Sequence, residues 1–92
     1  MADTRVYTEV TSDVLSSLRV LLAKKHVEMP TGDSGDFVVQ HGGLVTIELS
    51  FSRDDETDEL VLEITDKPEY VPEDNVWKVF DKGITDCGGQ TV

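Results

Sequence analysis

Carboxylates are the side chains of this sequence whose number and spacing come nearest to a chemical site. Asp54, Glu56 and Asp58 stand at the first, third and fifth positions of the pattern with which a calcium loop holds its ion. Such a loop requires glycine at its sixth position and a bidentate glutamate at its twelfth, where this chain has Glu59 and Thr65. We therefore expect the acidic run 54–59 to be a solvated turn without a functional calcium site.

The remaining short motifs lack the partners that their chemistry needs. Gly-Asp-Ser-Gly at 32–35 matches the surroundings of a serine-protease nucleophile, but that fold needs two barrels and more than twice this length. His-Gly-Gly at 41–43 has no accompanying Gly-x-Ser-x-Gly elbow. The two histidines and Cys87 lack zinc-ligand spacing. The sequence therefore predicts a protein that is not an enzyme and that has no catalytic residue, cofactor or metal.

The charge balance is the most distinctive property of the chain. Nineteen Asp and Glu residues against eight Lys and Arg give a formal net charge of -11 over 92 residues. A field of this sign repels nucleic-acid phosphates and anionic membrane surfaces, and it steers a basic protein towards the chain. We expect a basic protein partner, no direct nucleic-acid binding and no membrane binding.

The favoured function is a small inhibitory or protein-binding module that docks on a basic, nucleic-acid-binding protein. A phage antagonist, an immunity protein or a mimic of DNA charge would fit this description. The predicted contact residues are the acids of the turn, two glutamates of a solvated sheet face and two aromatic anchors. They are Asp54, Asp55, Glu56, Asp58, Glu59, Glu48, Glu63, Tyr70 and Trp77. The alternative is a structural subunit that forms a homodimer through a sheet edge or a helix surface.

Two segments with strict period-two alternation predict the centre of the fold. Apolar residues alternate with polar ones over 45–52 and again over 60–65, which is typical of strands with one buried face. Pairing Leu49 with Leu62 and Ile47 with Ile64 joins these strands as a hairpin. This register brings Arg53 near Asp58.

A third strand is predicted at 37–41. A two-residue loop to the next strand would set its apolar side chains on the wrong face. A loop of odd length pairs Phe37 with Leu49 and Val39 with Ile47, and places His41 opposite Val45. We therefore expect the odd loop, with a glycine at positive φ.

Two helices are predicted around these strands. Residues 4–10 are β-branched enough for a strand, yet their apolar positions also continue a helical face. The favoured interpretation is one helix over 4–25, and Thr11 or Ser12 can cap the part from Ser12 onward. Both interpretations remain open at this point.

The second helix is expected to begin at Pro72 and to end at Gly83 in a left-handed turn. Its predicted sheet-facing side chains are Val76, Val79 and Phe80. Trp77 would then lie at the edge of the buried stripe and border one surface patch with Tyr70.

The predicted fold class is α+β. An N-terminal helix, a three-stranded antiparallel β-meander and a C-terminal helix follow one another, with both helices on one face of the sheet. Residues 1–86 form a single domain and 87–92 a flexible tail. Cys87 has no second cysteine to pair with, and no segment has the composition of a signal peptide or a membrane span. We therefore expect a cytoplasmic protein.

Overall fold

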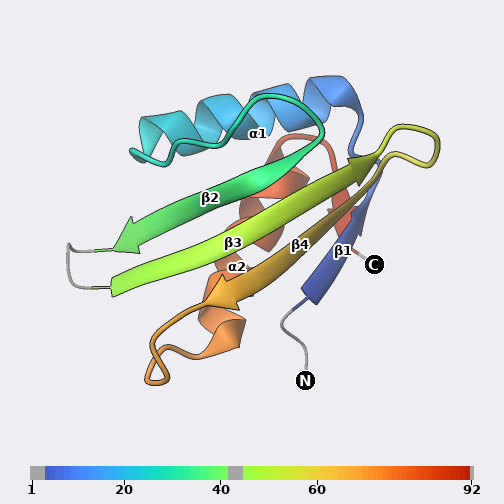
Figure 1. Ribbon diagram of the computed structural model, residues 1–92. Helices are drawn as coiled ribbons and strands as arrows, with labels where there is room; N and C mark the ends of the chain where they lie inside the picture. The colour runs from blue at the N-terminus through green and yellow to red at the C-terminus, as the bar shows by residue number, and fades with distance from the viewer. Residues whose placement is uncertain (1–3, 42–44, 92) are drawn as a thin grey trace.

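The computed structural model describes residues 4–41 and 45–91, apart from the side chain of His41. Within these residues it confirms an α+β fold with two helices and an antiparallel sheet, but the sheet has five strands where three were predicted (Figure 1). The elements follow in the order β1 (Thr4–Thr8), α1 (Ser12–Lys24), β2 (Ser34–His41), β3 (Val45–Asp54), β4 (Glu59–Asp66), α2 (Glu73–Asp86) and β5 (Gln90–Thr91).

The two additional strands come from the ends of the chain. The sheet order is β2-β3-β4-β1-β5, and β1 pairs antiparallel with both β4 and β5. The favoured helix over 4–25 is therefore wrong in its first part, because Thr4–Thr8 is a strand whose Tyr7 lies opposite Leu60 and is fully buried. Residues 87–92, predicted as a loose tail, include β5, in which Gln90 pairs with Thr8.

The register of the first hairpin is confirmed. Phe37 lies opposite Leu49, and His41 lies opposite Val45, so the connection has odd length. The expected positive φ falls on Gly42 or Gly43, outside the described residues.

The predicted register of the second hairpin is wrong by two residues. Leu49 lies opposite Ile64 and Phe51 opposite Leu62, with an irregularity between Glu48 and Leu49. A shift of two leaves every side chain on its original face, so periodicity does not distinguish the two registers. The turn decides between them, because Asp58 adopts φ 57° and its N–H donates to the Asp54 carbonyl at 2.9 Å.

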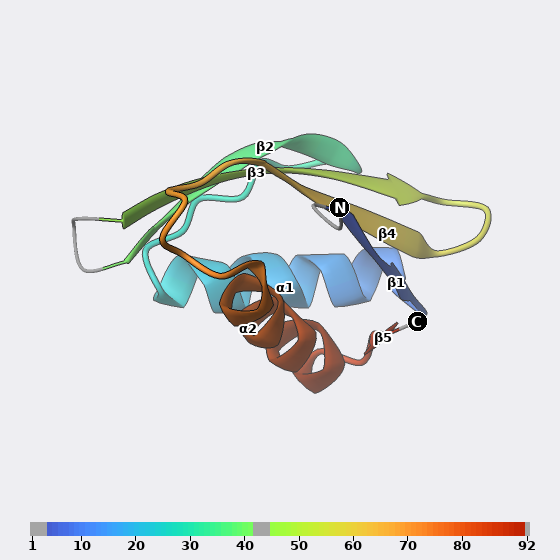
Figure 2. The ribbon, with the colours of Figure 1, turned by 90° about the horizontal axis from the view of Figure 1, so that it is seen from below.

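Both helices cover the same face of the sheet, as predicted (Figure 2). The buried apolar side chains of that face and of the helices form one core. Ile47, Leu49, Leu62 and Ile64 all belong to it. Among the described helices, none has both the length and the apolar content to cross a bilayer.

The ends of α1 follow local rules. Of the two predicted caps, Thr11 and Ser12, the N-cap is Thr11, and its hydroxyl accepts the Val14 N–H at 3.2 Å. At the C-terminal end His26 adopts φ 64°, and the Val27 N–H donates to the Leu22 carbonyl at 2.9 Å. These features define a Schellman turn with a histidine at the position that glycine usually occupies.

The C-terminal helix α2 is longer than predicted. It passes through Gly83, where an added Cβ would lie 3.4 Å from Leu21 of α1, so this glycine allows a close helix contact. The Schellman turn lies one turn later, with Gly88 at φ 110° and the Gly89 N–H donating to the Ile84 carbonyl at 2.9 Å. Gly88 and Gly89 therefore end the helix and direct the chain into β5.

The buried stripe of α2 also differs from the prediction. Val76, Trp77 and Phe80 are buried, whereas Val79 is 55 % exposed. The stripe is rotated towards Trp77 because β1 widens the sheet that α2 crosses, and Arg5 of β1 lies over the indole ring at 5.6 Å from its centre.

Candidate functional site

The outer face of the sheet is the surface that the two helices leave uncovered (Figure 2). Successive side chains of a strand point to opposite faces of the sheet. The side chains that point away from the core therefore lie on this outer face, and the observed registers align them between neighbouring strands. Val38 is exposed there, beside serine and threonine hydroxyls of β3. The acids that alternation directs to this outer face are Asp36, Glu48, Asp54, Glu59 and Glu63.

The basic residues of the chain all lie elsewhere. Arg5 contacts Asp81 of α2 on the side of the sheet that the helices cover. Arg53 lies two residues after Phe51 in β3, so alternation directs its side chain to the same covered side. The others lie in α1 or at its C-cap, in α2 or after β4, so the outer face has carboxylates and no cation among the residues that the structure describes. These others are Arg19, Lys24, Lys25, Lys67, Lys78 and Lys82.

The acidic turn joins this face but is partly committed to the fold. Asp54 lies opposite Glu59, and one of its carboxylate oxygens accepts the Glu56 N–H at 2.9 Å. Asp58 forms an ion pair with Arg53 at 2.9 Å, as the sequence predicted. Asp55 and Glu56 are exposed at the turn. Asp55 and Glu56 are therefore accessible to a partner, whereas Asp54 and Asp58 stabilise the turn itself.

Arg53 connects three segments at this end of the molecule. Its side chain is only 7 % exposed, and its guanidinium donates to Asp33 at 3.0 Å, to Asp58 at 2.9 Å and to the Val10 carbonyl at 3.4 Å. The hydrogen bond with Asp33 contributes most to raising the pKa of Arg53. This cluster ties the starts of α1 and β2 to the turn, so its role is structural.

A second polar cluster joins β1 to α2. The Asp81 carboxylate accepts the Tyr7 hydroxyl at 2.7 Å and the Arg5 guanidinium at 2.7 Å. Burial first, and then the hydrogen bond to Asp81, raise the pKa of Tyr7 far above its ordinary value. A tyrosine whose neutral form is favoured this strongly acts as a fixed hydrogen-bond donor and not as a base.

The two predicted aromatic anchors do not form one patch. Tyr70 is 72 % exposed in the segment before α2, whereas Trp77 is 3 % exposed and lies under Arg5. The structure thus places Glu48 and Glu63 on the same outer face as Asp54 and Glu59, and it buries Trp77 in the core on the opposite side of the sheet. Asp36, which the sequence interpretation missed, joins the outer face through the register of β2, where it lies opposite Ser50.

The described residues contain no group of three or more His, Cys, Asp and Glu side chains placed to hold a metal ion. Cys87 is half-buried at the C-cap of α2. Burial, and then the nearby Asp86, raise the pKa of its thiol and so disfavour the thiolate.

Comparisons of the chain with protein-family models, with curated proteins and with solved structures find no match.

Proposed function

We propose that the protein is a non-enzymatic binding or inhibitory module that docks on a basic protein through the outer face of its sheet. A nucleic-acid-binding protein is the class of partner that this charge favours. One observation carries the proposal: the uncovered face of the sheet has five carboxylates and no cation among the described residues. Complementary charge of this kind accelerates association and selects partners by sign.

The architecture supports this use of the face. The opposite side of the sheet packs in the core, so the strands hold their outward side chains on a rigid scaffold. Glu48 and Glu63 are exposed and lie on neighbouring strands. Val38 adds apolar area that a partner's side chain could cover. Asp55 and Glu56 extend the same charge beyond the end of the strands.

Affinity capture from lysate of the source cells tests the proposal with variants of equal charge. The outer-face variant combines E48Q with E63Q, and the control combines E28Q with E69Q, two exposed acids outside the strands. Each variant removes two negative charges. We expect the wild type and the control to retain a basic protein, identified by mass spectrometry, and the outer-face variant to lose at least 10-fold of it.

Two further measurements sharpen this experiment. Capture should weaken between 0.1 M and 0.5 M salt because the contact depends on charge. A variant with D55N and E56Q distinguishes docking on the turn from docking on the face. Equal retention by all variants, or equal loss from the outer-face variant and the control, would contradict a contact through the outer face.

A homodimer formed through β2 is the alternative function. β2 is the outermost strand on its side of the sheet, and Asp36 is its one charged residue. The Arg53 N–H donates to the Asp33 carbonyl at 2.6 Å, so alternation directs the backbone groups of Val38 and Gln40 away from β3. Sedimentation at low and high salt tests this alternative, since strand pairing predicts a dimer that persists at high salt.

A further inference from the structure

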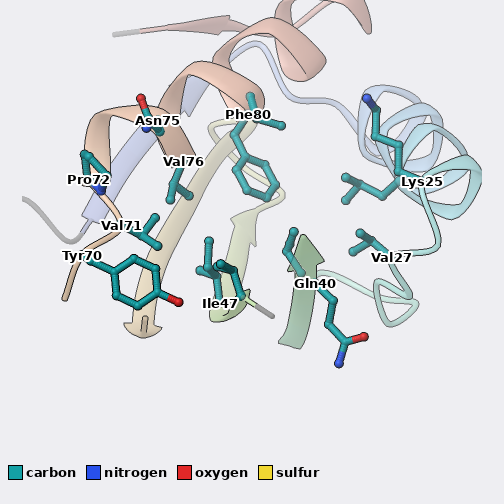
Figure 3. Close-up of a pocket in the computed structure, with 14 residues that line it drawn as sticks. Lys25, Val27, Gln40, Ile47, Tyr70, Val71, Pro72, Asn75, Val76 and Phe80 are labelled. Atoms are coloured by element: carbon teal, nitrogen blue, oxygen red, sulfur yellow. The ribbon is translucent and has the colours of Figure 1, made fainter. Parts of the chain in front are cut away.

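A hollow of about 650 Å³ opens at the end of the molecule opposite the acidic turn (Figure 3). It is surrounded by the C-terminal end of α1, the end of β2, the start of β3 and the N-terminal half of α2. Tyr70 and Val71, in the segment before α2, also line it. The volume is within the range of small-molecule sites. The site differs in place and in chemistry from the outer face of the sheet.

The wall of the hollow is mostly apolar. Phe80, Ile47 and Val76 are buried side chains of the wall, and Val27 closes it from the α1 side. Val39, Val45 and Val71 are half-buried, and Val79 is exposed. Water against such a wall has few hydrogen-bond partners, so an apolar group that displaces it gains free energy.

Polar groups stand at the margin of this wall. Figure 3 shows the Tyr70 hydroxyl directed across the hollow towards Ile47, whereas Lys25 lies on the opposite side with its ammonium directed away from Tyr70. The amides of Gln40 and Asn75 point away from the hollow. The Tyr70 hydroxyl is thus the polar group that faces into the hollow, and the flexible Lys25 side chain supplies a positive charge at the opposite margin.

The charge of the wall is opposite to that of the chain. No Asp or Glu is among the described residues that line the hollow, although the chain has nineteen acids, and Lys25 is the one charged residue of this described lining. Lys25 forms no ion pair with any carboxylate of the described residues. An anionic group can therefore approach Lys25 here without facing a neighbouring carboxylate in the wall.

We propose that this hollow binds a small amphiphilic carboxylate, a free molecule with an unbranched aliphatic chain of about eight carbons. The chain lies against Ile47, Val76 and Phe80, and the carboxylate lies at the margin beside the C-terminal end of α1, where the flexible Lys25 side chain can turn its ammonium towards it. A cationic amphiphile of the same length would bring its charge to Lys25 and be repelled. The apolar wall supplies affinity, and Lys25 favours a negatively charged ligand over a positively charged one.

Titration of the ¹⁵N-labelled protein followed by amide chemical shifts tests this proposal with three probes of equal chain length. The probes are octanoate, 1-octanol and octyltrimethylammonium. We expect octanoate to give saturable shifts concentrated at residues of the hollow and to bind at least 5-fold more tightly than octyltrimethylammonium. Absence of saturable shifts with octanoate, shifts spread over the whole sheet, or equal affinity for the two charged probes would overturn the proposal.

Two variants separate the role of charge from the role of space. K25Q should weaken octanoate binding at least 5-fold and leave octanol binding unchanged, whereas K24Q removes the same charge from a neighbour outside the lining and should leave both unchanged. V79F adds bulk at an exposed lining position and should abolish binding of octanoate and octanol while the protein stays folded. Equal effects of K25Q and K24Q, or full binding by V79F, would contradict the site.

Discussion

The two ends of this small sandwich are built in opposite ways. At the closed end, which we define by Tyr7, Arg53, Leu60 and Asp81, polar side chains join segments far apart in sequence, and Tyr7 and Leu60 are fully buried. At the open end, defined by the residues that line the hollow, apolar side chains from both helices and the sheet leave about 650 Å³ unfilled. Figure 1 shows the β3–β4 turn at one end of the sheet and the start of β3 at the other.

This difference shows how a small domain can be held together at one end while the other end stays open to a ligand. Arg53 and Asp81 hold the closed end through contacts between segments far apart in sequence. Among the residues that the structure describes, no side-chain hydrogen bond or ion pair crosses the open end, and exposed Tyr70 and Val79 border it. Stability is therefore expected to concentrate at the closed end, which leaves the open end free to accept a ligand.

The largest effect is expected from removing core side chains at the two ends. Leu60→Ala at the closed end should lower the free energy of unfolding by about 4 kcal/mol, and Ile47→Ala at the open end by about 2 kcal/mol. Leu60 is fully buried, so its removal leaves a dry cavity, whereas Ile47 already borders an opening to solvent. Urea denaturation measures both values, and equal losses would break the comparison.

Tyr7→Phe tests the polar connection at the closed end. It removes the hydrogen bond to Asp81 and keeps the ring in the core, so we expect a loss of about 1.5 to 2 kcal/mol. The raised pKa of Tyr7 means that the wild type is stabilised fully below the ordinary tyrosine pKa of about 10 and loses this stabilisation as the pH rises above it. Urea midpoints measured from pH 8 to 11 should fall more steeply for the wild type than for Tyr7→Phe, and parallel curves would contradict this role.

Gly88→Ala tests the helix end that directs the chain into β5. Alanine at φ 110° is strained, so we expect a loss of about 1 to 2 kcal/mol. The substituted Cβ would meet Val14 at an ordinary contact distance of 3.4 Å, so the cost comes from the backbone and not from a clash. Thermal unfolding gives the measurement, and an unchanged midpoint would show that the turn at Gly88 is not needed.

His26→Gly is expected to have the smallest effect and the opposite sign. His26 holds φ 64° at the end of α1, where glycine adopts this conformation without strain. Relief of that strain exceeds the entropy that glycine adds to the unfolded chain, for a net gain of about 0.5 kcal/mol. Thermal unfolding of the two proteins at one pH checks the sign, and a loss would show that the imidazole has a contact worth more than the strain.

The sequence by itself determined the parts of this protein that depend on neighbours along the chain. Alternation specified the buried faces of β3 and β4, and the pairing of apolar residues across an odd loop specified the first register. The start of α1 was not determined in this way, because the favoured interpretation extended one helix over 4–25. The acidic outer face also follows from alternation, because a solvated face and its charges are set by residues two apart.

Tertiary structure decided what depends on distant segments. Thr4–Thr8 became a strand because β4 offered it a pairing edge, and this strand drew Trp77 into the core and gave Asp81 the partners Arg5 and Tyr7. The two-residue shift of the second hairpin was invisible to a period of two and was settled by the geometry of its turn. The hollow has no sequence signature, because its lining residues come from segments that meet only when both helices are placed on the sheet.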